Sequence, residues 1–149
     1  MNVIPITLAI DWRCKHTWKT ASCNTSWCLL GCAIGDLGTI SYFQFMGIVW
    51  PVLAIMSLAI FNGLISSIML ETFILMKQNF SFINAFKTAS GMSLISMISM
   101  EIMMNLTDFL LTGGAILTWL VIPIMLIVGF LTPWPYNYLR LKKFGMTCH

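Results

Sequence analysis

Cysteine and histidine side chains are the first candidates for chemistry in this sequence. Those that could act together are Cys14, His16, Cys28, Cys32, Cys148 and His149. Thiolate and imidazole groups are soft or borderline ligands that suit Cu(I) or Zn(II). Their spacing lacks the paired Cys-x-x-Cys of common zinc sites, so the alternative is free thiols and a disordered tail. A metal site here would therefore suit either Cu(I) or Zn(II).

Cys28, Cys32 and Asp36 follow one another at four-residue steps, which places them on one face of a helix. Gly31 and Gly35 lie beside them in a small-x-x-x-small arrangement, which allows a neighbouring helix to approach closely. We therefore expect this part of the helix to be packed inside a bundle. The alternative role for the two cysteines is that of small packing residues.

A second polar group lies within residues 90–111. Met97, Glu101, Met104 and Asp108 recur at helical spacing, and Asn105 follows one turn after Glu101. A carboxylate inside a membrane is costly unless it is paired, protonated or turned into a bundle. Carboxylate, amide and thioether groups could coordinate a cation or relay protons. The alternative is that the carboxylates join helices and that the methionines fill space.

The depth of these residues in their helices predicts that polar side chains from three helices meet at the same height in the membrane. At a rise of about 1.5 Å per residue, counted from the end of each apolar stretch that is nearer the basic residues, Asp36 lies about 20 Å and Glu101 about 17 Å deep, and Asn62 falls at a similar depth. We therefore expect an intramembrane polar layer formed by Asp36, Asn62, Glu101, Asn105 and Asp108. Asp36, Met97, Glu101 and Asn105 also complete the set of candidate metal ligands.

The elements that must position these residues are membrane-spanning helices. The chain has 149 residues, of which 58% are hydrophobic and 9% charged, and its mean hydropathy is +0.87. Because a soluble domain carries about 25% charged residues, lipid is the expected solvent. Apolar stretches predict spans at about residues 22–45, 49–76, 90–111 and 115–131, the last kinked by Pro123, followed by a cytoplasmic tail at 132–149. The predicted fold is an all-α bundle of four transmembrane helices that forms a single membrane domain over residues 1–149.

The basic residues predict the orientation of this bundle. All eight Lys and Arg residues lie within residues 13–19, 77–87 and 140–143. The positive-inside rule therefore places both termini and the central loop in the cytoplasm, with the protein in the cell membrane. Phe82, Ile83 and Phe86 predict a short interfacial helix between the second and third spans. Every Cys and His then lies on or near the cytoplasmic side, where a reducing environment argues against disulfides.

Several other functions are excluded by the composition and motifs. The net charge of +3 is too small and too scattered for a nucleic-acid footprint. The sequence has no glycine-rich phosphate loop, no H-E-x-x-H, no C-x-x-C-H haem attachment and no G-x-S-x-G elbow. We therefore expect no nucleic-acid partner and no self-sufficient enzyme.

Four motifs resemble those of a known family. They are Cys28-Leu-Leu-Gly-Cys-Ala-Ile-Gly-Asp36, Ser96-Met-Ile-Ser-Met-Glu101 with Asn105 to Asp108, Leu111-Thr-Gly-Gly114, and Pro135-Tyr-Asn-Tyr138 through Cys148-His149. Over about residues 14–149 the chain resembles a small prokaryotic integral-membrane family known only as a domain of unknown function. The resemblance implies no established activity. It does imply an association with cupredoxin and multicopper-oxidase domains, and hence copper handling.

Three functions follow as hypotheses. The first is a membrane protein that binds or passes a transition metal, with copper as the first candidate and zinc as the second. The second is an accessory subunit of a larger membrane complex, such as a copper-dependent or respiratory oxidase, in which the polar layer joins helices. The third is proton or ion translocation through Asp36 and Glu101. The expected partners are the lipid bilayer and either other membrane subunits or further copies of this chain.

Overall fold

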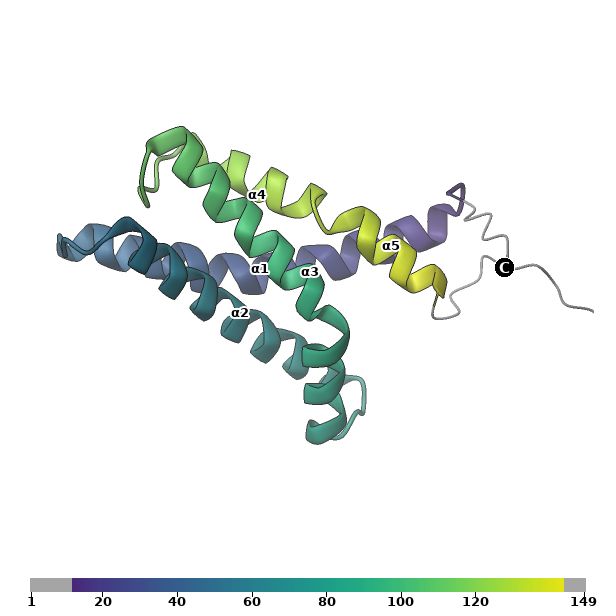
Figure 1. The fold of residues 1–149 in the computed structure, drawn as a ribbon. Coiled ribbons are helices and arrows are strands. Elements are labelled where there is room, and N and C mark those ends of the chain that lie inside the picture. Colours follow the sequence, from purple (N-terminus) through teal and green to yellow (C-terminus); the bar gives the residue numbers. More distant parts are fainter. Residues whose placement is uncertain (1–11, 144–149) are drawn as a thin grey trace, which may run out of the picture.

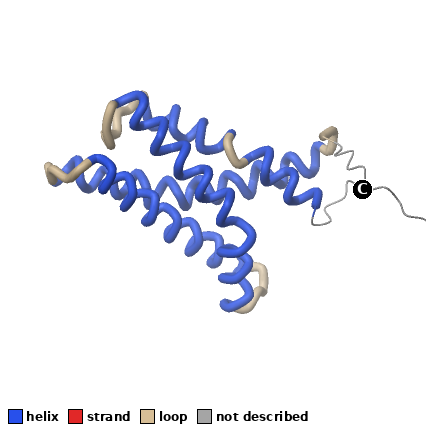
Figure 2. Tube along the Cα trace, in the orientation of Figure 1, coloured by secondary structure: helices blue, strands red, loops and turns tan. Residues whose placement is uncertain are grey.

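The computed structural model describes residues 12–143, and over this range the chain is helical. The helices are α1 (Lys15–Met46), α2 (Val52–Lys77), α3 (Phe82–Thr112), α4 (Val121–Leu131) and α5 (Trp134–Lys143). The start of α1 and the end of α5 lie at the same end of the bundle (Figure 1). Figure 2 shows short loops between the helices and no strand in the part of the chain that the structure describes.

Three helices are long and apolar enough to cross a membrane. They are α1, α2 and the part of α3 from Ser93 to Thr112. A hydrocarbon core of about 30 Å needs about 20 helical residues, and each of these stretches has at least that many. The all-helical fold is therefore confirmed over the described residues, and three of the helices could cross a membrane by their length and composition.

α4 is shorter than the sequence predicts. It begins at Val121 instead of residue 115, and its 11 residues extend only about 17 Å at a rise of about 1.5 Å per residue. Pro123 lies in the first turn of α4, where a missing backbone N–H costs no helical hydrogen bond. The proline therefore marks the beginning of the helix and not a kink within it.

The interfacial helix expected between the second and third spans is not a separate element. Phe82, Ile83 and Phe86 form the first turns of α3, which continues without interruption to Thr112. Gly91 is the only Gly or Pro within this helix, and a single glycine weakens a helix without ending it. Figure 1 shows this end of α3 angled away from the rest of the helix.

Two glycines allow α1 and α2 to approach closely. A Cβ atom at Gly31 would lie 2.6 Å from the Cα of Ser67, and one at Gly35 would overlap the backbone oxygen of Asn62. Ser66 and Ser67 donate hydrogen bonds to the carbonyl oxygens of Gly31 and Cys28. The close helix packing expected from the small-residue pattern is therefore present between these two helices.

Aromatic side chains hold α5 against the start of α1. Tyr138 is fully buried and stacks on Trp12 and Trp18, with ring centroids 5.2 and 4.2 Å apart. Asn137 Nδ2 donates a hydrogen bond to Thr25 Oγ1 at 2.8 Å. The segment predicted as a tail from residue 132 therefore contains a helix that packs on the bundle.

Substitution of Gly35 by Ala is expected to destabilise the protein, because the added methyl group would collide with the backbone of α2. We expect a loss of about 1–3 kcal/mol, measured by unfolding in detergent. Gly38→Ala is the matched control, since a Cβ atom there meets nothing within 4 Å. This control should be neutral or stabilising by up to about 1 kcal/mol. Equal stability of the two variants would contradict close packing at Gly35.

Candidate functional site

Six sulfur-containing side chains form one buried cluster between α1, α3 and α4. This sulfur cluster consists of Cys28, Cys32, Met97, Met100, Met104 and Met125. Cys28 is 8% exposed and the other five are fully buried. Both cysteines are free thiols. The cluster thus concentrates soft donor atoms in the interior of the bundle.

The periodicity of each helix brings these side chains together. Cys28 and Cys32 lie one turn apart on α1, and the three methionines of α3 recur at steps of three and four residues. Gly129 of α4 makes room for one of them, because a Cβ atom there would lie 2.6 Å from Met104 Cγ. On the side of α2, Ser67 Oγ lies 3.6 Å from Cys28 Sγ.

A polar layer borders the sulfur cluster. It consists of Asp36, Glu101, Asn105 and Asp108, each at most 3% exposed. Asn105 Nδ2 donates hydrogen bonds to Asp36 Oδ1 at 2.8 Å and to the backbone oxygen of Glu101 at 3.1 Å. The side chain of Glu101 also lies close enough to Cys32 for the two groups to interact. The layer and the cluster are therefore continuous.

Most oxygen atoms of the polar layer lack a hydrogen-bond partner within the described residues. They are Asp36 Oδ2, Glu101 Oε1 and Oε2, Asn105 Oδ1 and Asp108 Oδ2. The sequence has no Lys or Arg between residues 20 and 76 or between residues 88 and 139. Buried acceptors without partners are costly, and ionised carboxylates more so. The layer is thus suited to taking up a proton, a cation or water.

Asn62 does not join this layer. Its Nδ2 donates a hydrogen bond to Thr39 Oγ1 at 2.8 Å, in a groove between α1 and α2. The next residue, Gly63, faces the layer instead, because a Cβ atom there would overlap the Glu101 carboxylate. This part of α2 therefore lies at the predicted depth. Asn62, one residue earlier than Gly63, points toward α1 and not into the layer.

The cysteine and histidine group expected near the termini is not assembled within the described residues. Cys14 is disulfide-bonded, contrary to the expectation of a free thiol, and so cannot serve as a thiolate ligand. His16 is exposed on the first turn of α1, and Cys148 and His149 lie outside the described residues. Across residues 12–143, no group of three or more His, Cys, Asp or Glu side chains is placed to hold a metal ion.

Two members of the sulfur cluster were not singled out from the sequence. Met100 and Met125 resemble the many other methionines of this chain, which has 12. Met100 could have been found from its spacing of three residues after Met97. Met125 could not, because its position depends on how α4 packs against α3.

Comparison with known proteins assigns the chain to a family. Residues 17–145 match the family model described as Domain of unknown function (DUF4396). The chain belongs to this family. The matched DUF4396 region includes the whole sulfur cluster and the whole polar layer, and it confirms the family resemblance found from the motifs. No curated protein and no solved structure matches the chain.

The hydrogen bond between Asn105 and Asp36 predicts measurable coupling between the two residues. In a double-mutant cycle with Asp36→Ala and Asn105→Ala, unfolding in detergent should give a coupling free energy of about 0.6–1.7 kcal/mol. The control cycle pairs Asp36→Ala with Asn62→Ala and should give a value near zero. Coupling to Asn62 as strong as that to Asn105 would contradict this assignment of the layer.

Proposed function

We propose that this protein binds or passes a soft transition metal ion, with Cu(I) as the first candidate. The observation that carries the proposal is the sulfur cluster, which contains two free thiols and four thioethers among its buried side chains. Thiolate and thioether ligands select Cu(I) over the harder divalent ions. Cys28 and Cys32 would hold the ion, and the surrounding methionines would complete its ligand set.

The available donors favour Cu(I) over Zn(II). Structural zinc is bound by four Cys or His ligands, and catalytic zinc by three Cys, His or carboxylate ligands. The described residues place no such group, whereas the sulfur cluster holds four thioethers beside its two thiols. Zinc therefore remains the second candidate, as it is from the sequence.

The polar layer supports the same proposal because it lies beside the thiols. A thiol must lose its proton to bind a metal ion, and two thiolates already compensate the single positive charge of Cu(I). Glu101 lies beside Cys32, and Asn105 connects the backbone of Glu101 to Asp36. Carboxylates at these positions would accept the protons that the thiols release when the ion binds.

Elemental analysis of protein purified in mild detergent and loaded with Cu(I) under reducing conditions tests this proposal. We expect about one copper ion per chain, and its loss in Cys28→Ser and Cys32→Ser, because the hydroxyl group is a poor ligand for Cu(I). Cys23→Ser is the matched control, since Cys23 is a free but exposed thiol of the same helix. Met100→Leu keeps the packing volume and should weaken binding without unfolding the protein.

Two results would contradict metal binding by the cluster. One is equal copper content in Cys23→Ser and in folded Cys28→Ser. The other is a metal-free protein that purifies with a constant set of larger membrane proteins, which would instead support the role of an accessory subunit.

We further propose that α4 and α5 together complete a fourth crossing, with both termini in the cytoplasm and the protein in the cell membrane. In support, α4 and α5 run alongside α1 (Figure 1), and the basic residues all belong to segments at the helix ends expected in the cytoplasm. The disulfide at Cys14 argues against a cytoplasmic N-terminus, because disulfides are rare in a reducing cytoplasm.

Reporter fusions decide this orientation. A fluorescent protein that folds only in the cytoplasm should be bright at both the N-terminus and the C-terminus, whereas alkaline phosphatase should be inactive at both. Active phosphatase at both ends would show that both termini lie outside the cytoplasm. Active phosphatase at one end only would show that the chain crosses the membrane an odd number of times.

A further inference from the structure

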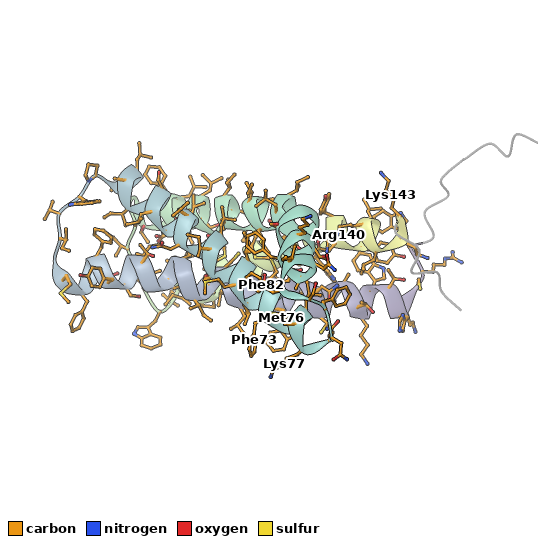
Figure 3. All side chains as sticks on the ribbon, turned by 90° about the horizontal axis from the view of Figure 1, so that it is seen from below. Phe73, Met76, Lys77, Phe82, Arg140 and Lys143 are labelled. Atoms are coloured by element: carbon orange, nitrogen blue, oxygen red, sulfur yellow. The ribbon has the colours of Figure 1, made fainter. Side chains whose placement is uncertain are left out.

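A second candidate binding site lies between the end of α2 and the start of α3, away from the sulfur cluster. It is a groove of about 330 Å³ lined by Met69, Thr72, Phe73, Met76, Phe82 and Phe86. Figure 3 shows the labelled Phe73, Met76 and Phe82 close to Lys77, apart from the labelled Arg140 and Lys143 of α5. No residue of the groove belongs to the sulfur cluster or the polar layer.

The walls of this groove are apolar and open to the surroundings. Phe73, Met76, Phe82 and Phe86 are between 44% and 61% exposed. The rings of Phe82 and Phe86 are stacked, with centroids 6.4 Å apart, so one wall is formed by a continuous aromatic surface. Such a concave apolar surface on helices that enter a membrane fits a hydrocarbon chain.

Polar groups flank the apolar walls. Lys77 Nζ lies 5.0 Å from the centroid of the Phe73 ring, which holds the ammonium group beside the groove. Thr72 lines the groove, is 5% exposed, and its Oγ1 has no hydrogen-bond partner within the described residues. An anionic headgroup at this end of the groove would meet the positive charge of Lys77.

No acidic side chain of the described residues offsets this positive charge at the groove. Glu71, the nearest acidic residue along the chain, accepts a hydrogen bond from Ser93 Oγ at 2.7 Å and is not among the residues that line the groove. The other described carboxylates belong to the buried polar layer. The groove is therefore apolar along its walls and positive at its Lys77 end.

We propose that this groove binds an anionic phospholipid. The acyl chain lies along Phe73, Phe82 and Phe86, and the phosphate group is bound by Lys77. A lipid fits better than a protein segment because the basic group lies at the end of an apolar helix, where headgroups are found, and basic sites between membrane helices bind anionic headgroups. The site is independent of metal binding by the sulfur cluster.

Native mass spectrometry of the metal-free full chain in detergent tests this proposal. The probes are phosphatidylglycerol and phosphatidylcholine with identical acyl chains, added at equal concentration. We expect about fivefold more bound phosphatidylglycerol, and equal binding of the two lipids in Lys77→Gln. Lys142→Gln on α5 is the matched control and should keep the preference. Phe82→Ala, at an exposed position that leaves the core intact, should reduce the binding of both lipids.

Three results would overturn the proposal. The first is equal binding of the two lipids to the unaltered protein. The second is a preference for phosphatidylglycerol that Lys77→Gln and Lys142→Gln change to the same extent. The third is a dimer that Phe82→Ala dissociates, because this would show that a second copy of the chain covers the groove.

Discussion

The close approach of α1 to α2 is the constraint on which the rest of the bundle depends. Gly31 and Gly35 leave no room for side chains against α2, and two serines of α2 donate hydrogen bonds to backbone oxygens of α1. Cys28, Cys32 and Asp36 lie on the neighbouring face of the same helix, so this packing directs them toward α3. A helix built in this way can bury thiols and a carboxylate because its small residues bring the neighbouring backbone close.

The two parts of the candidate site have complementary chemistry. The sulfur cluster supplies soft, polarisable donors, and the polar layer supplies oxygen atoms that lack partners within the described residues. α3 belongs to both, because Glu101 lies between Met97 and Met104 along the helix. Glycines of the neighbouring helices make room for this helix, with Gly63 opposite Glu101 and Gly129 opposite Met104. Soft sulfur donors suit a monovalent ion such as Cu(I), and the neighbouring carboxylates can accept the protons that thiols release when they bind it.

The sequence predicted those features of the fold that depend on neighbouring residues along the chain. Hydropathy located the long helices, and the four-residue spacing of Cys28, Cys32 and Asp36 identified their common face. The beginning of α4 depends on distant contacts, since the Gln44 side chain bonds to both the N–H and the carbonyl oxygen of Leu117 in the preceding loop. The orientation of Asn62 could not be predicted either, because depth along a helix follows from counting residues whereas rotation about its axis follows from packing.

The central claim is that the sulfur cluster binds Cu(I), and X-ray absorption spectroscopy of the copper-loaded protein tests it most directly. The account predicts Cu(I) with sulfur ligands alone, and loss of this copper–sulfur signal when Cys28 and Cys32 are replaced by Ser, while Cys23→Ser leaves it unchanged. Nitrogen or oxygen ligands that persist in the Cys28 and Cys32 variants would place the metal elsewhere in the chain and contradict the account.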